Sequence, residues 1–198
     1  MHRADELAES LLAEGYTGMK IWPFDGAAAA TWGQSISTDD LKRGLEPFRK
    51  IRRAVGDRME IMVELHSKWN LPTAMRIARA LEEFEPTWFE DPIVMDNIGA
   101  LAQFARSTRI PTCASETLAT RWAFREVFEA GATGIAMLDV AWTGGISEAK
   151  RIATLAETYH LPVAPHDCTG PVTLLASVHL CINAPNALTQ EVVRAFLH

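Results

Sequence analysis

The sequence predicts an α/β protein in which parallel strands alternate with helices. Segments with helical periodicity and short apolar segments follow one another strictly along the 198 residues, giving seven expected helices and seven expected strands. The connections between them are short, as in βα units built around a parallel sheet. Most expected strands are continuous apolar runs, which is typical of strands covered on both faces.

In the N-terminal half, the first two helices carry recognisable end signals. The amphipathic segment 4–18 stops at Gly15, and segment 38–56 begins with Thr38 as its N-cap and has Gly56 beyond its end. Two further helices are expected in segments 70–84 and 98–108. The strands between these helices are expected in segments 18–24, 59–66, 86–92 and 110–116.

The C-terminal half repeats the same alternation. Helices are expected in segments 119–131, 145–160 and 170–184, and strands in segments 132–141, 161–167 and 186–193. An open doubly wound sheet and a closed barrel both fit this order. No glycine-rich phosphate loop follows the first strand, which weakens the dinucleotide-binding version of the open sheet.

Composition and charge narrow the classes of partner. The net charge of −6 argues against non-specific nucleic-acid binding, and the basic cluster in 48–58 is interpreted as a solvated helix face. Three cysteines without CxxC spacing indicate a reducing compartment rather than a disulfide framework. No apolar run reaches the length of a membrane span, and the first residues do not form a signal peptide. We therefore expect a cytoplasmic protein.

An ionisable residue stands at the C-terminal tip of every expected strand. Such tips converge on one mouth in a barrel, and here, from Glu64 onward, they recur roughly every 25 residues, once per βα unit. This in-phase pattern favours the barrel over the open sheet. The residues are Lys20, Glu64, Glu90, Glu116, Asp139, His166 and Glu191.

The three glutamates on successive strands predict a metal site. Carboxylates crowded together repel one another by ~4 kcal/mol per close pair at an effective dielectric constant of ~20, so a cation is expected among Glu64, Glu90 and Glu116. Oxygen ligands suit Mg²⁺ first and Mn²⁺ second, whereas zinc is disfavoured because no Cys or His cluster accompanies them.

Two histidines are candidates for acid–base work. Asp139 and His166 lie on consecutive strands, so the aspartate can orient the imidazole as a general base. His66 follows Glu64 by two residues, and strand alternation predicts that both side chains face the mouth, where His66 reaches the substrate or supports a neighbouring group. A metal with a base predicts proton abstraction next to a carboxylate, with the metal stabilising the enediolate.

At this point the motifs match a family. They are KIW at 20–22, VELH at 63–66, WFEDP at 88–92, ASET at 114–117, LDVAWTGGISEAKRIA at 138–153, APHDCTGP at 164–171 and TQE at 189–191. Over nearly its whole length, the chain resembles the barrel domain of the enolase superfamily, mandelate racemase subgroup. The resemblance implies a TIM-type (β/α)7β barrel with Glu64, Glu90 and Glu116 as Mg²⁺ ligands. It also implies that His166 with Asp139 is the base and that Glu191 bonds the enediolate oxygen.

Departures from the family pattern bear on the reaction. Racemases of the subgroup carry a Lys-x-Lys motif whose second lysine is a base, and here Trp22 replaces it, leaving Lys20 to neutralise the substrate carboxylate. The ELH pattern resembles acid-sugar dehydratases similar to galactonate dehydratase, in which this histidine is the general acid. The resemblance thus implies a sugar-acid (aldonate) hydro-lyase, expected as a homo-oligomer with no nucleic-acid or membrane partner. Arg121 is a candidate for ordering the loop after the third ligand.

The resemblance also implies parts that we do not find in the sequence. The family's barrel begins with a strand before the first helix and follows an α+β capping domain, so residues 1–198 are expected to be an incomplete barrel domain of a longer enzyme, weakly active or inactive alone. Two alternatives remain open: a racemase or epimerase of a 2-hydroxy acid using Lys20 opposite His166, and a non-catalytic barrel that serves as a binding module.

Overall fold

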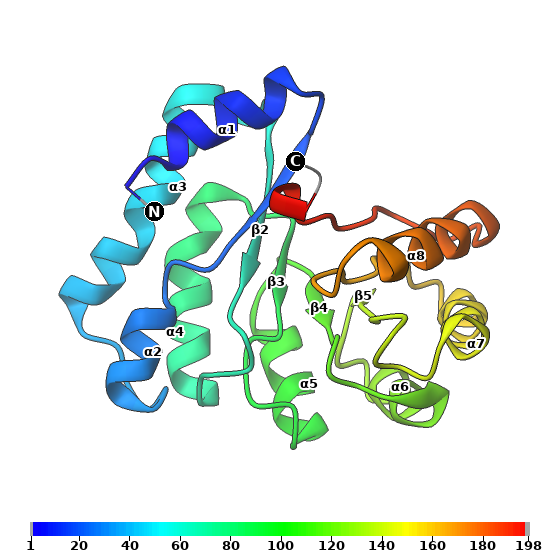
Figure 1. The fold of residues 1–198 in the computed structure, drawn as a ribbon. Helices are drawn as coiled ribbons and strands as arrows, with labels where there is room; N and C mark the ends of the chain where they lie inside the picture. Colours follow the sequence, from blue (N-terminus) through cyan, green and yellow to red (C-terminus); the bar gives the residue numbers. More distant parts are fainter. Residues whose placement is uncertain (1, 197–198) are drawn as a thin grey trace. The chain divides into compact units, whose positions relative to one another are not determined.

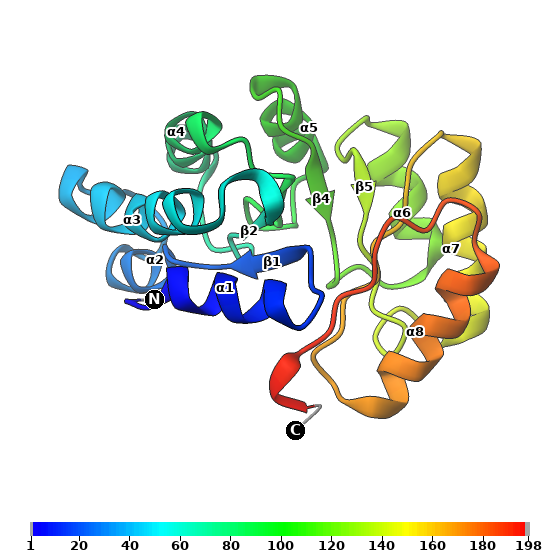
Figure 2. The same cartoon turned by 90° about the horizontal axis from the view of Figure 1, so that it is seen from above.

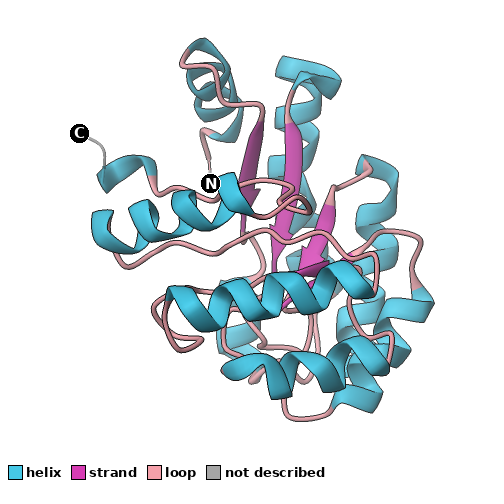
Figure 3. Cartoon of the chain, turned by 90° about the vertical axis from the view of Figure 1, so that its right-hand side faces the viewer, coloured by secondary structure: helices cyan, strands magenta, loops and turns pink. Residues whose placement is uncertain are grey.

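The computed structural model describes residues 2–196, which divide into two compact units after Thr112. Helices make up more of the described chain than strands (Figure 3). Strands and helices alternate along most of both units, and the strands are paired in parallel. The α/β class with a parallel sheet is therefore confirmed. None of the helices within residues 2–196 has the length and apolar character needed to cross a membrane.

The first unit has three strands in the order β1-β2-β3, with helices beside them (Figure 1). Helix α1 packs on α3, α3 on α4, and α4 on α5. Short 3₁₀ turns follow α3 and α4 at Gly56–Arg58 and Glu82–Phe84. The strands are β1 (Gly18–Ile21), β2 (Glu60–Glu64) and β3 (Trp88–Glu90), and the helices are α1 (Ala4–Ala13), α2 (Asp25–Thr31), α3 (Thr38–Val55), α4 (Leu71–Leu81) and α5 (Ile98–Ser107).

Local chemistry explains most of these helix boundaries. Gly15, just past α1, and Gly56, at the end of α3, both have positive φ, as expected for residues that end helices. Ser37 is the N-cap of α3, because its hydroxyl accepts the backbone N–H of Asp40, so the prediction of Thr38 was wrong by one residue. Helix α2 was not predicted at all.

Aromatic side chains fill the core of the first unit. Phe24, Phe48 and Phe84 form a stack, with ring centroids 6.5 Å and 5.7 Å apart. Burying each such ring stabilises the fold by about 1.5–3 kcal/mol. Gly44 on α3 makes room for the stack, since a Cβ there would lie 2.1 Å from Phe24 Cε1.

The second unit contains β4, which begins at Thr112, and the short strand β5, with helices packed in sequence order. Helix α6 packs on α7, and α7 on α8 (Figure 2). Arg121 at the start of α6 donates its backbone N–H and its guanidinium to Glu148 on α7, each over 2.9 Å. The elements are β4 (Thr112–Ala114), α6 (Thr120–Glu129), β5 (Ile135–Ala136), α7 (Ile146–Thr158), α8 (Pro171–Asn183) and a 3₁₀ turn at Arg194–Phe196.

The last two expected strands, 161–167 and 186–193, differ from the prediction. Val163 makes isolated parallel bridges with Ala136 and Ala187, and His166 makes one with Asp139. Pro162 and Pro165 have no backbone N–H to donate, so each removes one possible ladder hydrogen bond from this stretch. Its residues still follow the parallel course of the neighbouring strand, which places His166 beside Asp139.

Candidate active site

In the first unit, strand register gathers the predicted residues at the carboxyl ends of β1, β2 and β3. Glu64 pairs with Glu90, and Lys20 pairs with Met62, two residues before Glu64. Because side chains alternate along a strand, Lys20, Glu64 and Glu90 share one face of this sheet. All three are largely buried: Glu64 and Glu90 are at most 2% exposed, and the Lys20 side chain is 12% exposed.

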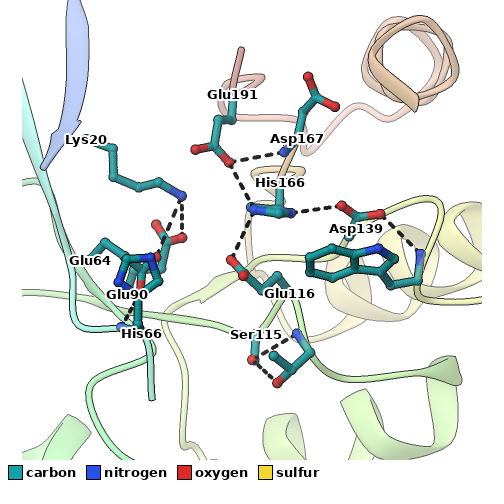
Figure 4. A network of polar contacts seen from close by, with 12 residues as sticks. Lys20, Glu64, His66, Glu90, Ser115, Glu116, Asp139, His166, Asp167 and Glu191 are labelled. Atoms are coloured by element: carbon teal, nitrogen blue, oxygen red, sulfur yellow. Dashed lines mark hydrogen bonds and ion pairs between the residues drawn. The ribbon is translucent and has the colours of Figure 1, made fainter. Parts of the chain in front are cut away.

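Lys20 and Trp88 hold the Glu90 carboxylate, and Figure 4 draws the contact from Lys20. Lys20 Nζ donates to Glu90 Oε1 over 2.5 Å, and Trp88 Nε1 donates to Glu90 Oε2 over 2.9 Å. The same ammonium lies 3.7 Å from Glu64 Oε2. A single cation therefore serves two buried carboxylates in this part of the site.

Glu64 is less well compensated than Glu90. Its Oε1 accepts the backbone N–H of His66, whereas its buried Oε2 has no hydrogen-bond partner among the described residues. Burial raises the pKa of Glu64 above its ordinary value, although the charge of Lys20 acts in the opposite direction. A buried carboxylate oxygen without a donor is the arrangement that a bound cation would complete.

The His66 side chain does not lie on the strand face where side-chain alternation predicted it. Strand β2 ends at Glu64, and both His66 and Ser67 have positive φ, so period-2 alternation does not extend to His66. The ring instead turns toward α2, where Nδ1 lies 3.1 Å and 3.0 Å from the two carboxylate oxygens of Asp25. The ring of Trp22 meets the His66 ring edge-on, with centroids 5.8 Å apart.

In the second unit, Asp139 and His166 form the predicted pair. His166 Nδ1 lies 2.8 Å from Asp139 Oδ2, and both side chains are buried (Figure 4). The other oxygen, Oδ1, accepts the backbone N–H of Ala141 over 2.7 Å and that of Trp142 over 3.1 Å. The carboxylate is thus fixed by the turn that follows it, and this fixes the imidazole with Nε2 directed away from Asp139.

Two predicted glutamates lie on the Nε2 side of His166. Glu116 Oε2 is 3.3 Å from Nε2, and Glu191 Oε2 is 3.9 Å away. Glu191 Oε2 also accepts the backbone N–H of Asp167 over 3.1 Å. Glu116 follows Ser115, whose Oγ accepts the backbone N–H of Thr117 over 3.2 Å. The second unit therefore brings Glu116, Asp139, His166 and Glu191 together.

Sequence reasoning missed two participants in the first unit. Trp88 opens the WFEDP motif, but nothing in the sequence indicates that its indole bonds the carboxylate two residues later. Asp25 lies in a loop-like stretch ahead of four alanines, and it contacts His66 as well as Lys68, whose Nζ lies 2.5 Å from Oδ2. The spacing of Asp25 and His66, 41 residues apart, gives no periodic signal.

Comparison with known proteins gives one family. The model of the enolase C-terminal domain-like family matches residues 3–198. D-galactonate dehydratase of Ralstonia nicotianae is 35% identical over 142 residues, which are 72% of this chain and 37% of that protein. Arabinonate dehydratase of Saccharolobus solfataricus is 32% identical over 152 residues, 76% of this chain and 41% of that protein. The chain thus spans about two fifths of these curated relatives.

Solved structures agree with the family match. A crystal structure of an enolase of the mandelate racemase subgroup from Agrobacterium tumefaciens is 61% identical and has a TM-score of 0.96, over 99% of this chain and 54% of that one. A mandelate racemase/muconate lactonizing enzyme-like protein from Rubrobacter xylanophilus is 35% identical with a TM-score of 0.89, over 95% and 48% of the two chains.

Proposed function

We propose that this chain, which belongs to the enolase superfamily as a C-terminal barrel domain of the mandelate racemase/muconate lactonizing subgroup, serves the Mg²⁺-dependent dehydration of a sugar acid. The observation that carries the proposal is its similarity to two acid-sugar dehydratases, D-galactonate dehydratase and arabinonate dehydratase. The proposed substrate is an aldonate, and the proposed product is a 2-keto-3-deoxy acid.

The donor set supports a hard divalent cation. Glu64, Glu90 and Glu116 are candidates for one metal site, and they offer only carboxylate oxygens. Mg²⁺ prefers such ligands, and Mn²⁺ accepts them. The buried Oε2 of Glu64 supports the same assignment, because it has no hydrogen-bond partner among the described residues. When bound, the ion supplies positive charge that stabilises the enediolate of the substrate.

The Asp139–His166 pair is proposed to begin the reaction. Asp139 holds Nδ1, so Nε2 is the nitrogen that takes the proton from C2 of the substrate. The electrons of the broken C2–H bond move into the carboxylate group and give the enediolate. Glu191 is proposed to hydrogen-bond the enediolate oxygen, and Lys20 to offset negative charge at the same site.

His66 is proposed to complete the elimination as the general acid. It gives a proton to the 3-hydroxyl as the C3–O bond breaks, and the enediolate electrons form a C2=C3 double bond. Water leaves, and the resulting enol tautomerises to the 2-keto-3-deoxy acid. Atoms and electrons balance without any further reactant. Trp22 supports elimination over racemisation, because its indole cannot act as the second base.

A screen of aldonic acids tests the proposal. The full-length protein is incubated with each acid in D₂O with Mg²⁺, and 2-keto-3-deoxy products are measured alongside deuterium at C2 of the recovered substrate. We expect product that depends on Mg²⁺. Deuterium incorporation without any dehydration across the library would favour an epimerase or racemase. Absence of both reactions, with no effect of Mg²⁺ on thermal stability, would favour a non-catalytic binding module.

A further inference from the structure

The segment after β1 reaches the catalytic histidine candidate of the first unit. It runs from Trp22 to Asp25 at the start of α2, and the side chains of these two residues contact the His66 ring. His66 has therefore an aspartate on Nδ1 and an aromatic ring against its edge. The arrangement repeats, within the first unit, the Asp–His pairing found separately in the second unit.

We propose that Asp25 is a positioning residue that orients His66 for proton donation to the leaving hydroxyl. Nδ1 lies within 3.1 Å of both carboxylate oxygens of Asp25, so the ring is held through this nitrogen and Nε2 is the atom presented to a substrate. Trp22, in place of a second lysine base, limits rotation of the ring by its edge contact. This inference rests on the proposed dehydratase function and adds a role for Asp25, which has none in it, and a second role for Trp22.

Asp25 is held as an anion suited to this role. Burial by itself works to raise the pKa of Asp25, but hydrogen bonds from His66 and Lys68 outweigh it, so the pKa lies below its ordinary value. Lys68 Nζ contacts Oδ2 over 2.5 Å, which gives the carboxylate a second partner besides His66. An ionised, doubly held carboxylate is a good acceptor for an imidazole N–H.

The backbone fixes the two partners relative to each other. Gly33, just past α2, has a positive φ, and a Cβ at this position would lie 1.7 Å from the carbonyl oxygen of Lys68. The N–H of Asn70 donates to the Gly33 carbonyl over 3.1 Å, and its side chain donates to the Gln34 carbonyl over 2.9 Å. The loop bearing His66 is thus docked against the end of the helix bearing Asp25.

A simpler role for Asp25 is that of an acidic residue in the first turn of a helix, where its charge interacts favourably with the helix dipole. That role needs only proximity to the helix end and is met by an exposed side chain. The Asp25 side chain is only 26% exposed and contacts two side chains from the segment after β2. Contacts of this kind are expected of a residue that positions another group rather than of a helix-end charge.

The test compares Asp25→Ala and Asp25→Asn with a matched control, Asp57→Asn, an exposed aspartate of the same unit. In the full-length protein with Mg²⁺ in D₂O, D-galactonate and arabinonate serve as probes. Two rates are measured for each variant: deuterium exchange at C2, which reports proton abstraction, and formation of 2-keto-3-deoxy acid, which also requires the acid. Melting temperatures show whether each variant is folded.

We expect Asp25→Ala to slow dehydration by about 10- to 100-fold, the usual cost of removing a residue that orients a functional imidazole, with C2 exchange nearly unchanged. Asp25→Asn retains an acceptor oxygen and is expected to recover part of the loss. Equal losses in both rates, or no loss in either, would overturn the proposal, because a merely structural residue does not change the partition between them.

A second readout separates this inference from the proposed function. The Nδ1–H resonance of His66 in ¹⁵N-labelled protein, measured without substrate, is expected to be protected in the native protein, weakened in Asp25→Asn and lost in Asp25→Ala. If neither probe is turned over, the dehydratase assignment for these acids fails while this spectroscopic result still decides whether Asp25 orients His66. If the Nδ1–H resonance is the same in the native protein and in both Asp25 variants, the positioning role is refuted.

Discussion

Replacing Asp139 by Asn is expected to impair His166 as the general base while keeping the hydrogen bonds that hold the turn after residue 139. The carboxylate is completely buried and has two separate duties: Oδ1 accepts two backbone N–H groups, and Oδ2 accepts His166 Nδ1. Asn can perform the first duty with its own oxygen. It cannot perform the second, because its NH₂ group then faces Nδ1 and donates to it. Nδ1 becomes an acceptor, and the neutral ring carries its proton on Nε2.

The substitution is expected to affect protein stability and reaction rate to different extents. A hydrogen bond to a charged group is worth about 1.5–3 kcal/mol and a neutral one about 1 kcal/mol, so we expect a stability loss of about 1–2 kcal/mol. For a protein of this size the melting temperature then falls by about 2–8 °C. The chemical effect is larger, because Nε2 can no longer accept a proton, and removal of a general base costs about 10²- to 10⁴-fold in rate.

Deuterium exchange at C2 of an aldonate substrate measures the base directly, since it does not require hydroxyl departure. Asp139→Asn and the exposed control Asp96→Asn are compared in the same buffer, with ¹⁵N spectra of the His166 ring to identify the protonated nitrogen. The expected result is proton transfer to Nε2 in the ring and loss of exchange in Asp139→Asn alone. An Asp139→Asn variant that keeps its exchange rate while its ring proton moves to Nε2 would falsify the assignment of His166 as the base.

Three further predictions follow from separate contacts. Saturating Mg²⁺, at about 100 times its Kd, should add about 2.7 kcal/mol and raise the melting temperature by about 5–11 °C, a shift that Glu64→Gln should abolish in calorimetry. The hydrogen bond from the Arg121 backbone N–H lowers the pKa of Glu148, although burial opposes this shift. Ionised Glu148 therefore stabilises the fold at pH values above its ordinary pKa, and this contribution is lost as the pH falls through the lowered pKa. The Glu148→Gln variant should therefore have a lower melting temperature than the native protein at pH 7 and the same melting temperature in acid. Gly44→Ala should cost about 1–3 kcal/mol by denaturant titration, because Phe24 blocks the new Cβ.

The residues of the site were predictable where a strand ends on a charge. Glu64 and Glu90 follow apolar runs of similar length, and parallel register then sets them side by side. The Asp139–His166 pair follows from the same regularity in the next βα units, and its contact is confirmed. Family motifs supplied the roles, which stay predictions. Spacing alone suffices in these cases because a strand direction determines where its last residue lies.

The other features of the site depend on local backbone turns that sequence periodicity does not indicate. The positive φ at His66 redirects its ring from the strand face toward α2, and non-glycine residues as a class adopt a positive φ only rarely. Helix α2 has seven residues, too few to show a period, so Asp25 looked like part of a loop. The interrupted strand at 161–167 does have a sequence signal, because Pro162 and Pro165 lack the N–H that a ladder needs.

One local device recurs at three strand ends and explains how the site is oriented. Glu64 Oε1 accepts the N–H two residues ahead, as do Ser115 Oγ and Asp139 Oδ1. In the two carboxylates, the bond to the turn occupies one oxygen and not the other: Glu64 Oε2 has no hydrogen-bond partner in the described part of the chain, and Asp139 Oδ2 contacts His166 Nδ1. The turn that ends the strand therefore decides which oxygen is available for chemistry. For this reason a change of side-chain length at these positions, such as Asp139→Glu, should disturb orientation more than charge, and should cost activity even though the carboxylate is kept.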